Sequence, residues 1–325
     1  MIEVFRAGLL TTVQDHGRHG HQHIGLCPGG AMDPVALTLA NVLVGNDGGE
    51  AALEITILGP ELAFAHDTLV ALCGADFAGG FPRNRPVLVA AGARLSIGRA
   101  QRGARAYLAV AGGLAVEPVL GSRATYLPGR FGGFLGRALR RGDRLPLREN
   151  AAALSRERFL KLRKPRGRSV RWHVAPFTLP EHEPVTLHAM EGPHYAMFDA
   201  ASQHAFFDAV WKIAPESNRM GFRLAGPALV RSDPGEILSG PICLGTVQVP
   251  ASGVPIALMA DHQTTGGYPR IAEIATADVP RLAQMAPGGR LRFARCDLKT
   301  AVELRRDQRA RVAPALRAIG WEYGN

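Results

Sequence analysis

The sequence is poor in cysteine, in lysine and in aromatic residues. Its four cysteines, Cys27, Cys73, Cys243 and Cys296, lie far apart and form no Cys-x-x-Cys pair. Only four of its 38 basic residues are lysines, and aromatic residues make up 6% of the chain. We therefore expect the cysteines to be small buried residues of a reduced protein, and they indicate no zinc site.

Motifs that bind nucleotides or carry a nucleophile are missing. The sequence has no Gly-x-x-x-x-Gly-Lys phosphate loop, no Gly-x-Gly-x-x-Gly after a predicted strand and no Gly-x-Ser-x-Gly elbow. These absences argue against the common NTPase, dehydrogenase and serine hydrolase classes.

A membrane span and a secretory signal are not expected either. Residues 237–260 form an uncharged stretch of 24 residues, but three prolines within it favour strands and turns. Residues 1–6 include Glu3 and no apolar segment, so we expect no secretory signal. We therefore expect a cytoplasmic protein with no membrane partner.

The 325 residues have the composition of a folded protein with two domains. Hydrophobic residues make up 46% and charged residues 20%, which is too apolar for disorder. The 38 glycines and 23 prolines suit many short strands and turns. We predict a mostly β fold with minor α content, consisting of two barrels.

A basic segment marks the predicted domain boundary. Arginines and lysines crowd residues 137–171, so we predict domains at 1–150 and 171–325, joined by a basic linker at 151–170. A short helix is predicted over 151–162, and an anionic docking surface is the alternative interpretation of the segment. Further helices are predicted over 34–44, with Asp33 as N-cap, and over 279–285.

The net charge of +10 attracts polyanions without any motif. The arginines outside the basic segment are scattered, so we expect no nucleic-acid partner.

The first candidate site lies in residues 8–33. The amides of Gly29 and Gly30 suit an anion-binding nest, and Asp15 and Arg18 suit a charge pair beside it. The alternative is that Asp15 and Arg18 brace a loop while Asp33 caps the helix. Four histidines between residues 16 and 23 lack a Cys or carboxylate to complete a ligand set, so we predict no metal.

The second and third candidate sites lie in residues 217–268. Arg219 and Arg223, expected to share one face of a strand, suit a carboxylate or phosphate. A run of polar residues then ends an apolar strand, as expected where a fold presents reactive groups. In this run, residues 261–265, we expect Asp261 to act as base or N–H acceptor and Thr264 and Thr265 as oxyanion donors. Gln263, together with Gln248 of the preceding segment 245–250, is expected to read an amide.

Seven ordered segments make the chain resemble the family of KipA and the 5-oxoprolinase C subunits, also called allophanate hydrolase subunit 2 or biotin-dependent carboxyltransferase family proteins. They are GLLTTVQD (8–15), GGAMD (29–33), LVGN (43–46), YLAVAGG (107–113), LGSR (120–123), NRMG (218–221) and DHQTTGGYP (261–269).

The resemblance implies a pair of cyclophilin-like β-barrel domains and a cytoplasmic member of a heteromeric complex. Together with an A subunit and a KipI-like B subunit, such a protein opens 5-oxoproline to glutamate at the expense of ATP. Catalytic roles are then expected for Asp261, Arg219, Gln263 and Gln248. Substrate-binding roles are expected for Thr264 and Thr265 of the third site. The same role is expected for the residues of the first site, which are Asp15, Arg18, Gly29 and Gly30.

Two alternatives remain open within the resemblance. One is carboxyl transfer from biotin to urea or a related amide; no lysine lies between methionines, so biotin would not be attached to this chain. The other is a regulator that binds and antagonises a KipI-type kinase inhibitor.

Overall fold

The computed structural model describes residues 1–162, 167–233 and 235–324. It divides into two compact units: unit 1 comprises residues 1–18, 29–179 and 311–325, and unit 2 comprises residues 19–28 and 180–310. This division differs from the predicted domains at 1–150 and 171–325. The predicted linker, whose residues 163–166 lie outside the described ones, falls within unit 1.

The linker prediction fails for a physical reason. Helix α2 (Ala151–Lys161) has the predicted position, but Phe159, Leu162, Val170 and Val174 are buried in a core of unit 1. The basic residues of this segment are interspersed with apolar residues that pack into this core. Its high charge therefore did not indicate a solvated linker.

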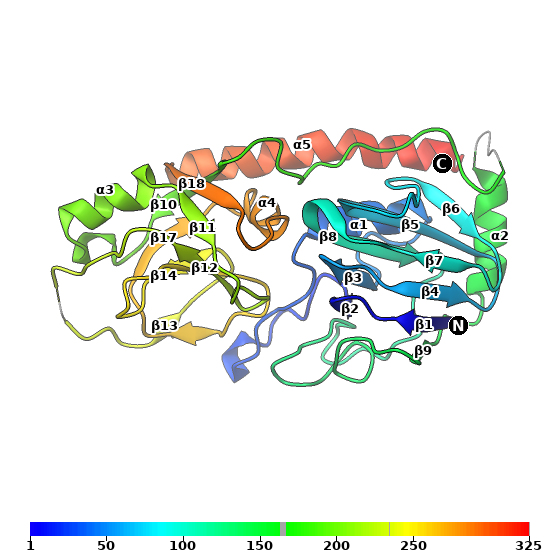
Figure 1. Ribbon diagram of the computed structural model, residues 1–325, viewed down its shortest axis with the longest axis horizontal. Helices are drawn as coiled ribbons and strands as arrows, with labels where there is room; N and C mark the ends of the chain where they lie inside the picture. The colour runs from blue at the N-terminus through cyan, green and yellow to red at the C-terminus, as the bar shows by residue number, and fades with distance from the viewer. Residues whose placement is uncertain (163–166, 234, 325) are drawn as a thin grey trace. The chain divides into compact units, whose positions relative to one another are not determined.

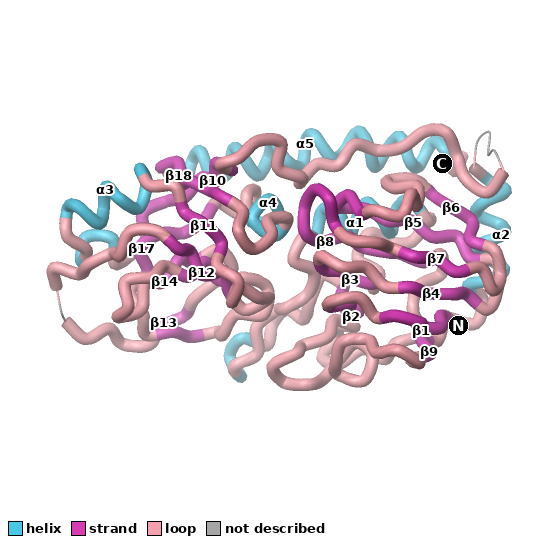
Figure 2. Tube along the Cα trace, viewed as in Figure 1, coloured by secondary structure: helices cyan, strands magenta, loops and turns pink. Residues whose placement is uncertain are grey.

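Unit 1 is built from two antiparallel sheets (Figure 2). One has the order β7-β4-β1-β9, and the other has the order β2-β3-β8-β5-β6. The strands are β1 (Ile2–Arg6), β2 (Leu10–Gln14), β3 (Ala52–Thr56), β4 (Glu61–Phe64), β5 (Thr68–Phe77), β6 (Pro86–Val89), β7 (Arg94–Ser96), β8 (Ala100–Val110) and β9 (Arg144–Leu145).

The five-stranded sheet is buried on both faces. Along β5, Val70 and Leu72 belong to one apolar cluster with Phe64 of the other sheet. The alternate residues Leu69 and Ala71 belong to a second cluster, which includes helix α1 (Pro34–Leu43). Because side chains alternate along a strand, a continuously apolar strand such as β5 can fill both cores.

Helix α1 begins where the sequence predicts. The Asp33 side chain accepts the amide N–H of Ala36 at 3.0 Å, and Pro34 occupies the first turn. The Asp33 carboxylate also accepts the hydroxyl of Thr178 at 2.5 Å. The predicted N-cap is therefore confirmed. It is also hydrogen-bonded to Thr178, close to the end of segment 29–179 of unit 1.

Unit 2 contains a closed barrel of seven strands in the order β10-β17-β14-β15-β12-β11-β18 (Figure 1). A two-stranded sheet, β13-β16, is separate from it. The strands are β10 (Val185–Glu191), β11 (Trp211–Ile213), β12 (Gly221–Ala225), β13 (Gly240–Pro241), β14 (Thr246–Gln248), β15 (Ile256–Leu258), β16 (Thr265–Gly266), β17 (Arg270–Ile274) and β18 (Arg290–Arg295). The mostly β prediction is confirmed.

Helices complete the chain. Unit 2 carries α3 (Ala200–Asp208) and α4 (Val279–Ala283), the latter at the predicted position. Helix α5 (Leu298–Glu322) contributes residues to both units and was not predicted. No helix among the described residues is long and apolar enough to span a membrane.

Two of the four cysteines are not buried as expected, since Cys243 is exposed and Cys296 is half-buried.

Candidate functional site

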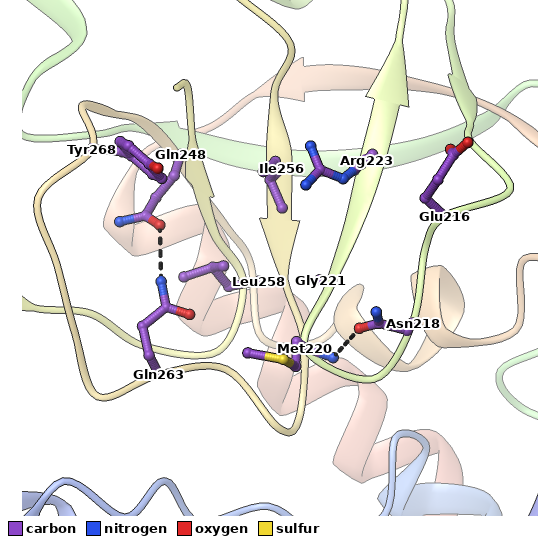
Figure 3. Close-up of a pocket in the computed structure, with 10 residues that line it drawn as sticks. All are labelled: Glu216, Asn218, Met220, Gly221, Arg223, Gln248, Ile256, Leu258, Gln263 and Tyr268. Atoms are coloured by element: carbon purple, nitrogen blue, oxygen red, sulfur yellow. Dashed lines mark hydrogen bonds between the residues drawn. The ribbon is translucent and has the colours of Figure 1, made fainter. Parts of the chain in front are cut away.

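A pocket of about 620 Å³ lies on the wall of the barrel in unit 2 (Figure 3). Strand register places Arg223 of β12 beside Ile256 of β15, and Ile256 beside Gln248 of β14. Phe222 and Ala257, which alternate with these residues, are fully buried. The pocket is therefore built on one face of three neighbouring strands. Its lining residues are Glu216, Asn218, Met220, Gly221, Arg223, Gln248, Ile256, Leu258, Gln263 and Tyr268.

Two glutamines face each other across one side of the pocket (Figure 3). The Gln263 Nε2 donates to Gln248 Oε1 at 3.4 Å. Gln248 is 1% exposed, and its Nε2 has no hydrogen-bond partner among the described residues. A buried amide N–H group without a partner is costly, so a carbonyl or carboxylate oxygen in the pocket would be bound favourably.

The Gln248 amide occupies space that a side chain at residue 266 would fill. A Cβ added to Gly266 would lie 2.5 Å from Gln248 Nε2. The flap formed by β13 and β16 therefore passes close to this amide only because residue 266 has no side chain.

Arg219 and Asp261 are not among the described residues that line the pocket. Their side chains bind each other beside it. Arg219 Nε donates to Asp261 Oδ2, and Nη2 donates to Oδ1, both at 2.9 Å. The two side chains are 3% and 1% exposed. The pair thus holds the segment before β12 against the segment after β15. Arg219 precedes β12, so it does not share the strand face that presents Arg223.

The remaining residues of the polar run have different environments. His262 is buried, its Nδ1 lies 2.5 Å from the Gln263 carbonyl oxygen, and burial lowers the pKa of its imidazole. The Thr264 carbonyl accepts the N–H of Ile242, and Thr265 lies in β16. Both threonines therefore belong to the flap, and neither is among the described lining residues.

The first candidate site belongs to unit 1, where Asp15 is a structural acceptor. Its Oδ1 accepts the Gly17 N–H at 2.8 Å and the Ser122 hydroxyl at 2.6 Å, and its Oδ2 accepts the Arg123 N–H at 2.6 Å. The carboxylate therefore fixes the long loop that follows Ser122, as in the bracing interpretation.

Arg18 and the paired glycines support the same loop region. Arg18 is 1% exposed, donates from Nη2 to the Ala124 carbonyl and lies 4.8 Å from the centre of the Phe131 ring. Gly29 and Gly30 both have positive φ, and a Cβ at Gly30 would lie 2.6 Å from the Gly17 nitrogen. The glycines thus allow close backbone packing, and the anion nest stays a prediction.

The sequence interpretation missed a polar cluster in the core of unit 1. The Tyr107 hydroxyl donates to Glu54 Oε2 at 2.7 Å and accepts the Asp33 N–H at 2.8 Å. Burial, followed by the charge of Glu54, raises the pKa of the Tyr107 phenol. The same Glu54 oxygen accepts the Met32 N–H, so the cluster fixes the start of α1. A tyrosine and a glutamate within apolar strands are the only signal for it.

The described residues include no group of three or more His, Cys, Asp or Glu side chains that could hold a metal ion. The four histidines between residues 16 and 23 are divided between the units. His16 belongs to unit 1, where its Nε2 lies 3.3 Å from the Thr38 hydroxyl, whereas His19, His21 and His23 belong to unit 2.

Two pocket residues have little or no signal in the sequence, because Asn218 belongs to a motif without a role of its own and Glu216 lies outside every motif. Arg223, predicted to suit a carboxylate or phosphate, does line the pocket. Asn218 precedes the pocket-lining Gly221 and accepts the Met220 N–H through its Oδ1 at 2.8 Å. Because Glu216 and Asn218 lie in the connection between β11 and β12, strand alternation could not place them.

A model of the family described as "Carboxyltransferase domain, subdomain A and B" matches residues 24–295. The chain therefore belongs to this family of carboxyltransferase domains, and the resemblance found in its motifs is confirmed.

Two bacterial relatives match over nearly their full length. The chain is 43% identical to the 5-oxoprolinase C subunit of Escherichia coli, over 95% of both chains. It is 36% identical to the 5-oxoprolinase C subunit of Haemophilus influenzae, over 94% of both chains.

Longer fungal proteins contain a similar region. Urea amidolyase of Lachancea kluyveri is 33% identical over 95% of this chain, which spans only 18% of that protein. The crystal structure of Kluyveromyces lactis urea amidolyase matches with a TM-score of 0.84 at 31% identity, over 96% of this chain and 20% of that one.

Proposed function

We propose that this protein is the C subunit of a cytoplasmic, ATP-dependent 5-oxoprolinase complex, in which it acts with an A subunit and a KipI-like B subunit. The full-length match to the 5-oxoprolinase C subunit of E. coli supports this assignment. In the proposed reaction the lactam C–N bond of 5-oxoproline is hydrolysed to give glutamate, while ATP is cleaved to ADP and phosphate.

The observation that carries the proposal is the buried amide of Gln248 in the pocket. Its Nε2 has no partner among the described residues, while its Oε1 already accepts from Gln263. The carbonyl oxygen of a lactam is an acceptor that would satisfy the free N–H groups. The Gln263 Oε1 would accept the lactam N–H, so the two glutamines together would read an N–C=O group.

Arg223 supplies the recognition of a second group. It lines the same pocket as Gln248 and lies one strand beyond Ile256. Guanidinium matches a carboxylate through two parallel hydrogen bonds, and 5-oxoproline carries one carboxylate beside its ring. We assign Arg223 to this carboxylate, and we assign the Arg219–Asp261 pair to positioning the pocket wall rather than to direct contact.

The protein's contribution to the reaction is orientation and charge stabilisation. Transfer of the terminal phosphoryl group of ATP to the lactam oxygen, with ADP leaving, would make the ring carbon electrophilic. Water would attack this carbon, the C–N bond would break to leave an acyl phosphate, and a second water would hydrolyse it to glutamate and phosphate. The Gln248 N–H groups, aimed at the lactam oxygen, would stabilise the charge that develops there.

The test is glutamate formation from 5-oxoproline and ATP by the full chain assembled with candidate A and B partners. Activity should be lost when any one of the three proteins is omitted. Gln248→Glu should lower kcat/KM by about tenfold or more, because a carboxylate would repel the lactam oxygen. Gln22→Glu, an exposed change of the same kind in unit 2, should not. Undiminished activity without this chain, or in the Gln248 variant, would refute the proposal.

Carboxyl transfer to urea is the second candidate, favoured by the match to urea amidolyase. The higher identity and full-length coverage favour the 5-oxoprolinase assignment. If the assembled complex makes no glutamate but a biotinylated carrier domain supports urea carboxylation, the second candidate replaces the first. Partner binding without either activity would indicate the KipA-like regulatory role.

A further inference from the structure

A second pocket, of about 520 Å³, lies in unit 1 where β5 connects to β6. Its size is in the range of small-molecule sites. The residues that line it come from this connection, from β8 and from the segment after α2. They are Phe77, Ala78, Gly79, Gly80, Phe81, Pro82, Arg83, Asn84, Arg85, Gln101 and His173.

Asn84 is held rigidly in the pocket wall. It is 8% exposed and has a left-handed backbone with φ of 54°. Its N–H donates to the Leu72 carbonyl at 2.8 Å, and its carbonyl accepts the Val174 N–H at 2.9 Å. Its side-chain amide has no hydrogen bond within the described parts of the chain. The backbone of Asn84 is therefore fixed, and its side-chain amide is accessible in the pocket and can bind a polar ligand there.

The pocket carries positive charge. Arg83 and Arg85 line it with His173, and no carboxylate is among its described lining residues. Arg85 Nη1 donates to the carbonyls of Val170 and Arg171, which fixes the direction of its guanidinium. Arg83 pairs with Asp76, and burial, followed by the charge of Arg102, lowers the pKa of its guanidinium. Arg85 has no carboxylate partner among the described residues, so its charge is available to an anion in the pocket.

The pocket also has open backbone and an apolar side. Gly79 and Gly80 have positive φ, and a Cβ added to Gly80 would meet nothing within 4 Å. A ligand can therefore approach the main chain of Gly80 closely. Phe77 and Phe81 pack against the core of unit 1 and supply apolar surface. Together these features suit a ligand with an anionic end and a flat apolar part.

We propose that this pocket binds the phosphate groups of a nucleotide. Arg85 and Arg83 would bind phosphate oxygens, the Asn84 amide would donate to them, and the phenylalanines would lie against the base. The choice of a nucleotide rests on the proposed function, which consumes ATP, whereas the recognition of phosphate rests on the pocket alone.

The test is calorimetric titration of the full chain, without its partner proteins, with tripolyphosphate, ATP and adenosine. Tripolyphosphate and ATP should bind, ATP more tightly, and adenosine alone more weakly than either. Asn84→Asp should weaken binding of both anions by about tenfold or more, because it places a negative charge against phosphate. Asn84→Gly, which keeps the left-handed backbone, should weaken binding in the same direction.

The matched control is Asn150→Asp, the same chemical change at an exposed residue of unit 1 whose side chain makes no capping hydrogen bond. Thermal unfolding of each variant shows whether it is folded. The site is refuted if neither anion binds, or if the Asn84 variants bind as tightly as the control. Equal affinity for ATP and tripolyphosphate would overturn the nucleotide assignment. Intact ATP binding in a complex that makes no glutamate would instead refute the proposed function.

Discussion

Arg219 and Asp261 bind each other through two parallel hydrogen bonds of 2.9 Å and are almost completely buried. The backbone strengthens the relationship, because the Asp261 N–H donates to the Arg219 carbonyl at 2.8 Å. Two segments that flank β12 and β15 are thus joined by both side chain and main chain. Met220 follows Arg219 directly, and Gln263 lies two residues after Asp261. The pair therefore positions the segments from which these two side chains line the pocket.

Breaking this pair should destabilise unit 2. Asp261→Asn leaves a buried guanidinium without its counter-charge, which we expect to lower the free energy of unfolding by about 3–5 kcal/mol. The double variant Arg219→Met with Asp261→Leu should lose less, because no uncompensated charge remains. Urea unfolding followed by tryptophan fluorescence measures both. A single variant as stable as the wild type would show that the pair has no structural role.

Gly266→Ala should lower activity while leaving the fold intact. Gly266 does not have a positive φ, so its backbone conformation suits alanine. The Cβ of this alanine would displace the Gln248 Nε2. The displaced atom is the end of a flexible side chain, so unfolding should change little. In the assembled complex we expect KM for 5-oxoproline to rise by about tenfold or more.

Gly267→Ala is the matched control for this change. The nearest atom to a Cβ at Gly267 is the Ser239 hydroxyl oxygen at 3.2 Å, so the Gln248 amide is not displaced. If both alanine variants leave KM unchanged, Gln248 does not contact the substrate.

Much of the fold could be predicted from local patterns. The Asp33-Pro34 pair marked the start of α1, and the helices predicted over 151–162 and 279–285 correspond to α2 and α4, because these signals depend on neighbouring residues only. Helix α5 was missed because it is mostly polar, contains Pro314 and buries few residues, such as Val312 and Ile319. Its apolar spacing is too sparse to mark a helix face.

The candidate site was predicted only in part. Gln248 and Gln263 both line the pocket, whereas Asp261 and Arg219 are not among its described lining residues. Asp261 and Arg219 lie 42 residues apart, and the sequence alone could not show that each is the other's partner. Pairing across the barrel depends on strand register, which the sequence specifies only through the whole fold.

Asp15→Asn should destabilise unit 1. The carboxylate accepts three hydrogen bonds, from Gly17, Ser122 and Arg123, and an amide would direct N–H groups at one of these donors. We expect a loss of about 1–3 kcal/mol in the free energy of unfolding. Asp233→Asn, an exposed change of the same kind in unit 2, is the control for thermal unfolding. Equal midpoints for the two variants would contradict the bracing role.

Glu273 should make the stability of unit 2 depend on pH. It lies opposite Thr246 in the ladder of β14 and β17, and the Thr246 hydroxyl donates to its Oε2 at 2.7 Å. Burial is the largest effect and raises the pKa of the Glu273 carboxyl, although the hydrogen bonds from Thr246 and Cys243 oppose it. The native state therefore holds this proton more tightly than the unfolded state does, and stability falls as the pH rises through the raised pKa.

Glu273→Gln removes this titration while keeping an oxygen that can accept the Thr246 hydroxyl. Relative to the wild type, the variant should gain stability between about pH 5 and about pH 8, because only the wild type must bury a carboxylate at the higher pH. Urea unfolding at both values measures the difference. Glu303→Gln, on the exposed side of α5, reports the effect of removing a surface charge. If Glu273→Gln differs from the wild type by the same amount at both pH values, burial does not set the ionisation of this carboxyl.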